Sequence, residues 1–453
     1  MTQNGKMSVA APGRYYQSVW RWHFMAGMVV IPFLFMLTFS GLLMLLSKPL
    51  DSALNTDRLT VAVGDSRVPV NTLLHTVEQQ YPHYAIKLYL PPQAPTQSAQ
   101  FSLQPHSHAG HGGHHAPATL VYLNPYTGEI LGDRDPATSL YARIKTFHGS
   151  LFMGGVGDAL IEMAAGLAVL MIVTGLYLAW PKQGWRALLP RREVKSRLAW
   201  RQWHLTMGWL IALPLVFFLI SGLAWTNVWG GKIVQPWGSL PGTRYVPQTE
   251  TAPSARDHSA MNEHGVHRVP WALEQTPMPV APTAEQRLTL DDVVNLARAK
   301  GFGGFRVHFP QQSADVWTVS ATTIAGDITD PGQEWIVHLD PATGETLQAI
   351  RFADYPAMGK AMAASIPFHQ GDLGPWNWWL NLLFVCLILV LIVTGGMLWW
   401  KRQTRRVAPS APQKPALVVA TIMLLVALLF PLSALAMLVL IAVDVCVLRR
   451  GMR

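Results

Sequence analysis

The sequence predicts an integral membrane α-helical bundle, with four core helices and a C-terminal helical hairpin, that carries two α+β outer domains. Half of the 453 residues are hydrophobic and only 13% are charged, which is the balance of a membrane protein. The apolar residues gather in runs long enough to cross a bilayer, which takes about 20 residues. One arrangement of motifs also occurs twice along the chain, so the core reads as a duplicated two-span unit.

Five apolar stretches define the membrane part. Four of them predict one span each, at 19–47, 148–181, 201–226 and 369–400. The first is longer than the apolar core of a signal peptide and no small-residue cleavage site follows it, so we expect an uncleaved span. The fifth stretch, 415–448, is too long for one ordinary span and breaks at Phe430-Pro431. It predicts a hairpin of two short helices or one long kinked helix.

The basic residues predict the orientation. The net charge of +9 comes largely from short segments that contain bases and almost no acid, at 1–18, 182–200, 401–414 and 449–453. The positive-inside rule places these in the cytoplasm and the long segments 48–147 and 227–368 in the periplasm. A basic C-terminal tail on the cytoplasmic side favours the hairpin for 415–448. Because the membrane topology explains the basic charge, we expect no nucleic-acid partner. We expect membrane lipid to surround the spans.

Each outer segment predicts one helix followed by strands. In the first segment, Val68–Gln80 has the apolar spacing of a helix. The second segment has an irregular preface at 236–286 and then a helix at Leu290–Ala299, opened by Thr289. The expected strands are Ala85–Leu90, Gln100–Leu103, Thr119–Leu123, Phe305–Phe309, Asp315–Ala321 and Glu334–Leu339.

The last hairpin of each segment has the same turn sequence. Residues Tyr122–Glu129 read Tyr-Leu-Asn-Pro-Tyr-Thr-Gly-Glu, and residues His338–Glu345 read His-Leu-Asp-Pro-Ala-Thr-Gly-Glu. Both stretches resemble the final hairpin of PepSY domains. The spans resemble the PepSY-associated transmembrane family over about 20–400, and this family includes siderophore-iron reductases of the bacterial inner membrane. The resemblance implies haem-bearing spans, two PepSY-like periplasmic domains and reduction of iron at the periplasmic face.

Four histidines lie at matched places in the duplicated frame. His23 and His204 each lie seventeen residues before a Ser-Gly pair, at 40–41 and 221–222. His148 and His369 each follow a phenylalanine and precede an apolar run that ends in Val-Thr-Gly, at 173–175 and 393–395. The first two begin outward spans and the other two precede inward spans. Hydrocarbon about 30 Å thick separates the two sets, so only same-side pairs can share a cofactor.

Two imidazoles facing each other in a helix bundle suit the axial positions of a b-type haem. We therefore expect two haems, one held by His23 and His204 on the cytoplasmic side and one by His148 and His369 on the periplasmic side. Histidines at a membrane edge are often only interfacial residues, but four at matched depth in a repeat favour ligation. The glycines of the Ser/Thr-Gly pairs would allow close approach of a ring or helix.

Three other features leave alternatives open. Arg21 and Arg201 are candidates for contacts with haem propionates, although the topology signal explains them equally well. Glu162 lies within a span, where it suits a proton relay or quinol contact, or a hydrogen-bonded structural role. A Gly/His tract could wrap a transition metal, although an incidental weak binder fits it equally well. Its histidines are His106, His108, His111, His114 and His115.

The function expected from these features is transmembrane electron transfer to a periplasmic ferric siderophore or other iron chelate. No dinucleotide-binding motif follows a strand, so the electrons come from a cytoplasmic flavoprotein or from membrane quinol. The residues support electron transfer, and the resemblance supplies the siderophore. Two rivals are a haem-free, membrane-anchored PepSY module that regulates a partner, and a metal-uptake permease that uses the Gly/His tract.

Overall fold

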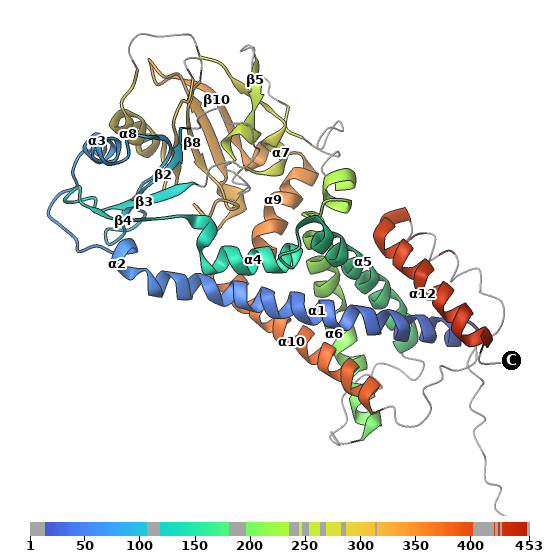
Figure 1. Cartoon of the computed structure of the whole chain (residues 1–453). Coiled ribbons are helices and arrows are strands. Elements are labelled where there is room, and N and C mark those ends of the chain that lie inside the picture. The colour runs from blue at the N-terminus through green and yellow to red at the C-terminus, as the bar shows by residue number, and fades with distance from the viewer. Residues whose placement is uncertain are drawn as a thin grey trace, which may run out of the picture. The chain divides into compact units, whose positions relative to one another are not determined.

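The computed structural model divides the chain into two compact units (Figure 1). The membrane unit comprises Met1–Leu42, Thr146–Ile233 and Leu382–Arg453, and the sheet unit comprises Leu43–Lys145 and Val234–Asn381. The residues that the structure describes are 14–106, 118–180, 196–234, 244–246, 253–262, 269–281, 287–312, 315–401, 421, 425 and 428–450.

Four helices among the described residues are long and apolar enough to cross a membrane. The apolar stretches are Val19–Leu54, Gly154–Ala179, Arg197–Leu223 and Pro375–Trp400. They belong to α1 (Arg14–Leu54), α5 (Gly154–Ala179), α6 (Arg197–Leu223) and α10 (Pro375–Trp400). Their facing surfaces form one apolar core, which includes Val30, Leu167, Ile211 and Ile392. The four predicted spans are therefore present as candidate membrane helices.

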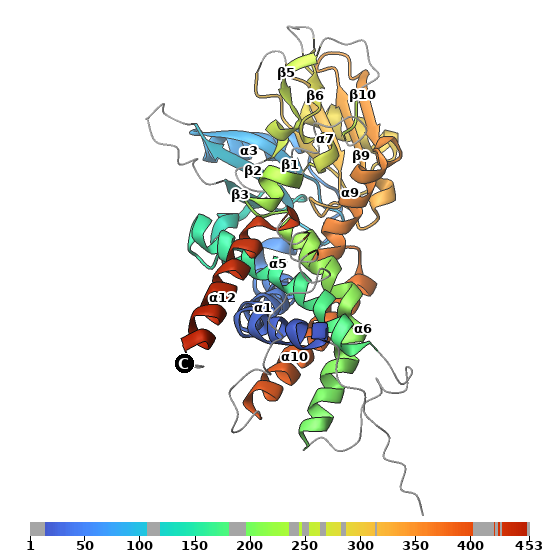
Figure 2. The same ribbon diagram turned by 90° about the vertical axis from the view of Figure 1, so that its right-hand side faces the viewer.

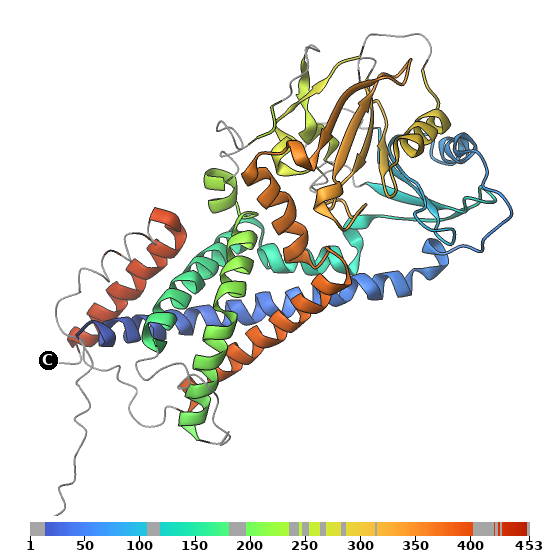
Figure 3. The ribbon, with the colours of Figure 1, turned by 180° about the vertical axis from the view of Figure 1, so that it is seen from behind.

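The C-terminal stretch is described mainly from α12 (Pro431–Arg450). This helix begins at the proline where the sequence predicts a break, and most of 415–430 lies outside the described residues. The hairpin therefore stays a prediction. Helix α12 packs beside α5 (Figure 3), where the Ser433 hydroxyl donates to the carbonyl of Met163 at 2.9 Å. Gly166 permits this approach, since a Cβ there would lie 2.1 Å from the Ser433 oxygen.

The histidines before the second and fourth spans lie on helices of their own, which corrects the predicted starts of those spans at 148 and 369. His148 is in the last turn of α4 (Leu140–Ser150), and His369 is in the last turn of α9 (Ala357–Gln370). Positive φ angles follow each helix, 56° and 59° at Leu151 and Phe152 and 79° at Gly371. Left-handed residues cannot continue an α-helix, so the spans begin anew at α5 and α10.

The sheet unit contains one antiparallel sheet of eight strands in the order β10-β9-β8-β7-β1-β2-β3-β4. Its two halves join where β1 pairs with β7, through Leu88 opposite His308 and Tyr89 opposite Val307. The segments 48–147 and 227–368, for which the sequence predicts two separate domains, therefore share one sheet. The strands are β1 Tyr84–Leu90, β2 Ala99–Pro105, β3 Thr119–Leu123, β4 Ile130–Arg134, β7 Arg306–His308, β8 Trp317–Ala321, β9 Trp335–Leu339 and β10 Thr346–Arg351.

The matching turns of the two halves make matching hydrogen bonds. In the first turn, Asn124 N donates to the Glu129 carbonyl at 2.9 Å, and Gly128 N donates to the Asn124 carbonyl at 2.9 Å. In the second, Asp340 N donates to the Glu345 carbonyl at 2.9 Å, and Gly344 N donates to the Asp340 carbonyl at 3.0 Å. Both glycines have positive φ, 77° and 74°. The shared turn sequence thus encodes one backbone conformation.

Helices α3 (Val70–Gln80) and α8 (Leu290–Lys300) cover one face of the sheet (Figure 1). They enclose a common apolar core with alternate strand residues such as Phe101, Val121 and Val337. Helix α8 starts with the expected Thr289, whose hydroxyl accepts from Asp292 N while the Asp292 carboxylate accepts from Thr289 N. This capping box satisfies backbone donors that the helix leaves open.

The described part of the preface covers the other face of the second half, so the prediction of an irregular segment over 236–286 is corrected for 253–262 and 269–281. Its described part contains strands β5 (Pro253–Asp257) and β6 (Pro277–Pro279), which pair, and the short helix α7 (Trp271–Glu274). These elements lie against the sheet beside β9 and β10 (Figure 2). Leu273 and Val269 pack with Ile336, Ile350 and Ala363 of α9 in a second core. Burial of these few apolar residues orders a sequence whose composition is that of a loop.

Glu334 lies directly before β9 and is only 1% exposed. Its Oε1 accepts from the backbone N of Thr323 at 3.0 Å and from the Thr323 hydroxyl. Burial raises the pKa of this carboxyl to about 7, although the hydrogen bonds from Thr323 partly oppose the shift. Removing a charge from water is costly, so the folded sheet unit favours the protonated form.

We predict that Glu334→Gln stabilises the sheet unit at pH 8 but not at pH 5. The folded carboxyl keeps its proton up to about pH 7, whereas an unfolded chain loses it near pH 4.5. The free energy of unfolding of the native protein therefore falls as the pH rises through this window, by about 3 kcal/mol at most. Thermal unfolding in detergent at both pH values measures the difference. Glu345→Gln, in an exposed turn, is the matched control, and equal shifts at both pH values for Glu334→Gln would contradict the prediction.

Candidate functional site

The candidate site in the membrane unit is built on imidazoles that contact a hydroxyl on a neighbouring helix. His23, on α1, places its Nδ1 3.0 Å from the Thr174 hydroxyl on α5. That hydroxyl donates within its own helix, to the carbonyl of Leu170 at 2.9 Å. The carbonyl of Met171 also lies within hydrogen-bonding range of the ring of His23.

These contacts determine the tautomer of His23. A carbonyl oxygen can only accept, and the hydrogen of Thr174 is directed at a carbonyl of its own helix. The ring nitrogen must therefore be the donor, so Nδ1 carries the hydrogen. In the neutral imidazole, Nε2 then carries the lone pair. This is the tautomer that binds a metal through Nε2, with its other nitrogen oriented by an acceptor.

The same arrangement recurs in the second half of the membrane unit. His204 on α6 places Nδ1 3.2 Å from the Thr394 hydroxyl on α10. Thr394 donates to the carbonyl of Leu391 at 2.8 Å, and this carbonyl also contacts the ring of His204. His204 is therefore protonated at Nδ1 and carries its lone pair on Nε2, as His23 does.

His148 makes an equivalent contact with the first Ser-Gly pair. Its Nδ1 lies 2.8 Å from the Ser40 hydroxyl, which donates to the carbonyl of Met36 at 2.7 Å. The carbonyl of Leu37 accepts from the same ring. Three of the four predicted ligands thus have one orientation and one tautomer, each held by a hydroxyl from a Ser-Gly or Thr-Gly pair.

The glycine of each Thr-Gly pair makes room for the imidazole. A Cβ added to Gly175 would lie 3.0 Å from Cε1 of His23, and one added to Gly395 would lie 3.2 Å from Cε1 of His204. At Gly41 the corresponding distance to Cε1 of His148 is 3.6 Å, an ordinary contact. The Thr-Gly pairs therefore combine a hydrogen-bond acceptor with the space that the ring requires.

The structure brings two of the predicted ligands, His23 and His204, near each other. His23 and His204 lie close enough for their charges to interact, although they belong to different halves of the sequence. Both rings are only half-buried, as is that of His148. His369 is half-buried on α9 and belongs to the sheet unit. Its pairing with His148 stays a prediction.

The chemistry of these residues fits haem. Neutral imidazoles with a lone pair on Nε2 are the usual axial ligands of b-type haem iron, and the apolar core of the helices suits the macrocycle. His23, His204 and His148 have this tautomer, with the hydrogen on Nδ1 and the lone pair on Nε2. Arg21 is buried on α1 and Arg201 is exposed on α6, so their surroundings differ although their places in the repeat match. Contacts of either with propionates stay predictions.

Glu162 has a structural partner within the membrane unit. Its Oε2 accepts from the backbone nitrogens of Val228 and Trp229, at 3.2 and 3.1 Å, where the chain leaves α6. Its Oε1 is buried without a hydrogen-bond partner in the described structure. The carboxylate therefore caps the start of the π-helical turn Trp229–Val234, which supports the structural role.

The Gly/His tract is almost entirely outside the described residues, which include only His106. Within the described part of the chain, no group of three or more His, Cys, Asp or Glu side chains could hold a metal. His108, His111, His114 and His115 therefore keep their status as predicted metal-binding residues.

Sequence reasoning missed a polar layer buried in the sheet unit. His308, Thr318 and His338 lie opposite one another on β7, β8 and β9, and His258 packs on them from the preface. All four side chains are at most 9% exposed. Polar residues at alternate strand positions normally indicate a solvated face. The signal available was that histidines occupy these positions on two of three neighbouring strands.

Comparison with known proteins identifies a family. The family model described as the PepSY-associated TM region matches residues 20–402. A search of curated proteins found no match.

We predict that Gly175→Ala removes haem from the proposed site of His23 and His204, whereas Gly41→Ala leaves haem at the proposed site of His148. The added methyl group meets His23 at 3.0 Å in the first case and His148 at 3.6 Å in the second. Alanine favours a helix by about 1 kcal/mol over glycine, so a loss of haem would not reflect a weaker helix. Haem per protein, measured by pyridine haemochrome, checks this. Gly396→Ala, where nothing lies within 4 Å, is the control, and full haem content in Gly175→Ala would refute the role of the glycine.

We predict that Thr174→Val weakens haem binding about 10- to 100-fold, the usual effect of losing the group that orients a ligand. Valine keeps the shape of threonine but cannot accept the hydrogen of His23 Nδ1. Thr174→Ser retains the acceptor and should bind haem normally. Titration of haem into apoprotein measures both. Equal affinity in the valine and serine variants would show that the hydroxyl does not orient the ring.

Proposed function

Because the chain belongs to the family of proteins with a PepSY-associated transmembrane region, we propose that it is a di-haem b oxidoreductase of the bacterial inner membrane. It moves electrons outward to a ferric siderophore or a similar iron chelate in the periplasm. Each iron(III) centre takes up one electron and becomes iron(II), which hard oxygen ligands hold less tightly. The electrons come from membrane quinol or from a cytoplasmic flavoprotein.

The observation that carries this proposal is the shared state of His23, His204 and His148. Each donates from Nδ1 to a helix hydroxyl and keeps the lone pair of Nε2. An interfacial histidine has no need of one fixed tautomer, because water can satisfy either nitrogen. Three matching tautomers in a helical core fit ligands that must meet iron.

Haem, when bound, supplies the reversible one-electron chemistry that the side chains lack. The residues of the chain hold and orient it. The inner pair is His23 and His204, and the outer pair is His148 and His369. The hydroxyls of Ser40, Thr174 and Thr394 keep the imidazoles in position. Apolar side chains around the ligands exclude water and lower the local dielectric, which tunes the potential.

The orientation completes the proposal. The basic segments between spans lie in the cytoplasm together with both termini, and the sheet unit lies in the periplasm as two PepSY-like halves. Its helix-then-hairpin plan, with the same hydrogen-bonded turn in both halves, supports an origin by duplication. The periplasmic sheet unit would then receive the chelate on the side where iron is released.

The reduced-minus-oxidised visible spectrum of the purified protein, with haem quantified, tests the proposal. We expect a b-type α-band and two haems per chain, and loss of about one haem in each of His148→Ala and His204→Ala. His75→Ala, an exposed histidine of α3 that pairs with Glu78, should keep both haems. A protein expressed with ample haem that shows no α-band would instead be a haem-free PepSY module or a permease. Loss of haem in neither histidine variant would refute the ligand assignment.

A further inference from the structure

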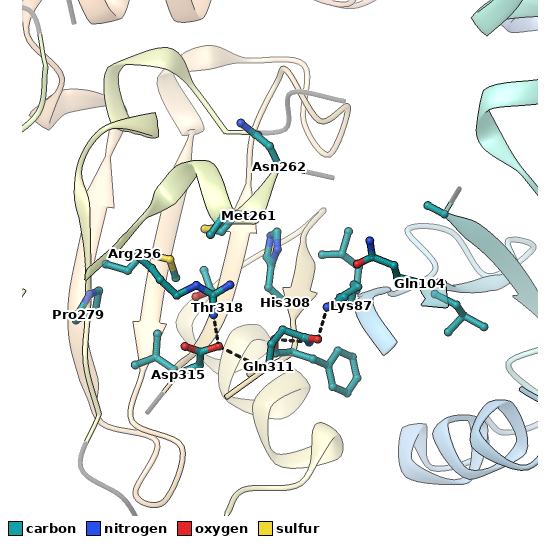
Figure 4. Close-up of a pocket in the computed structure, with 17 residues that line it drawn as sticks. Lys87, Gln104, Arg256, Met261, Asn262, Pro279, His308, Gln311, Asp315 and Thr318 are labelled. Carbon is teal, nitrogen blue, oxygen red and sulfur yellow. Dashed lines mark hydrogen bonds and ion pairs between the residues drawn. The ribbon is translucent and has the colours of Figure 1, made fainter. Parts of the chain in front are cut away.

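The sheet unit contains a cavity that the electron-transfer proposal does not use (Figure 4). It lies where β1 and β7 join, between the strands and the preface, and has a volume of about 250 Å³. Its polar lining comes from both halves of the sheet and from the preface, and includes Lys87, Gln104, Arg256, His308, Gln311 and Thr318. Small-molecule pockets usually begin at about 300 Å³, so this cavity suits a small compound.

The charge of the lining favours an anion. Among the described residues that line the cavity, Lys87 and Arg256 are basic and only Asp315 is acidic. The carboxylate of Asp315 accepts from Arg256 Nη1 at 2.7 Å and from the backbone nitrogens of Gln311 and Gln312, both at 3.0 Å. Lys87 Nζ donates to the neutral amide oxygen of Gln311 at 2.6 Å. The acid is thus already satisfied by three donors, and the lining keeps a net positive charge.

A buried chain of hydrogen bonds sets the polarity of Thr318. The carbonyl of Thr276 accepts from His258 Nδ1 at 2.6 Å, so that nitrogen carries the hydrogen. Burial lowers the pKa of His258 and of His338, so both rings are neutral. His258 Nε2 is then an acceptor, and His338 Nε2 must donate to it across 2.9 Å. His338 Nδ1 in turn accepts from the Thr318 hydroxyl at 2.8 Å.

Thr318 therefore offers only lone pairs to the cavity that it lines, because its one hydrogen is committed to His338. A ligand hydroxyl can donate to this oxygen, while the net positive charge that Lys87 and Arg256 leave on the lining favours carboxylates. An amino acid would bring its donor as a second positive charge beside two bases. Met261 and Phe309 provide apolar walls for a short carbon chain.

We propose that this cavity binds a small hydroxycarboxylate, with its carboxylates against Lys87 and Arg256 and its hydroxyl donating to Thr318. Ligand binding at this site needs no haem, so a test of this proposal can succeed or fail independently of a test of electron transfer. It is a ligand-binding function of the sheet unit, assembled from the two halves and the preface.

Calorimetry on the full-length protein in detergent, without added metal, tests the proposal with two probes. Citrate has the hydroxyl, and tricarballylate is the same tricarboxylic acid without it. We expect citrate to bind at one site per chain, about tenfold or more tighter than tricarballylate, because a site built around a hydroxyl rejects the analogue that lacks it. No binding of citrate at millimolar concentration, or equal binding of the two acids, would overturn the proposal.

Three variants in the cavity and one control elsewhere in the sheet unit assign the effect to the cavity. Thr318→Val should bind both acids equally, and Thr318→Ser should restore the preference for citrate. Lys87→Met should weaken both acids about tenfold while their ratio stays the same. Lys300→Met, on α8 at the other face of the sheet, should change neither. A preference that survives in a folded Thr318→Val protein, or equal losses in both lysine variants, would place the binding elsewhere.

Discussion

The hydrogen bond from a histidine Nδ1 to a hydroxyl of the neighbouring helix is the contact on which the membrane unit depends. Hydrocarbon offers no partner to a ring N–H, so the protein must supply one. Thr174 serves His23, and it remains satisfied because its own hydrogen returns to a carbonyl one turn earlier in α5. One bond therefore fixes the rotation of the ring and its tautomer, and leaves the lone pair on Nε2.

The same hydrogen bond recurs in both halves of the membrane unit, and it explains why a hydroxyl residue and a glycine are adjacent in each motif. A hydroxyl residue and a glycine in sequence place an acceptor and an open space on neighbouring positions of one helix. Thr394-Gly395 repeats for His204 what Thr174-Gly175 does for His23. The hydroxyl alone would leave the ring without room, and glycine alone would leave Nδ1 without a partner.

In the sheet unit, the groups that require hydrogen-bond partners are polar side chains buried on the sheet. Its second half has an apolar face under α8 and a polar face under the preface. Polar side chains are stable there only when each finds a partner. Arg306 makes a buried, bidentate ion pair with Asp327 at 2.6–3.1 Å, and the chain from Thr276 to Thr318 passes through two neutral histidines. The chain fixes the hydrogens of His258, His338 and Thr318, which gives Thr318 a defined acceptor role at the adjoining cavity.

The sequence by itself determined the features that depend on local periodicity and composition. The four spans, helices α3 and α8, the strands of both halves and the two Asx-Pro turns all follow from neighbouring residues. The four histidines of the candidate site were found in the same way, because their frames repeat. Their roles as ligands rest on chemistry that a spectrum must test.

The tertiary structure decided how these pieces combine. The pairing of β1 with β7, the partner of each Nδ1 and the short helices that carry His148 and His369 all depend on residues far apart in the chain or on positive φ angles that propensity does not reveal. Strand alternation shows that His308, Thr318 and His338 share a face, but not what covers that face. The cover comes from a segment with the composition of a loop, and only its packing on the sheet makes the polar face part of the core.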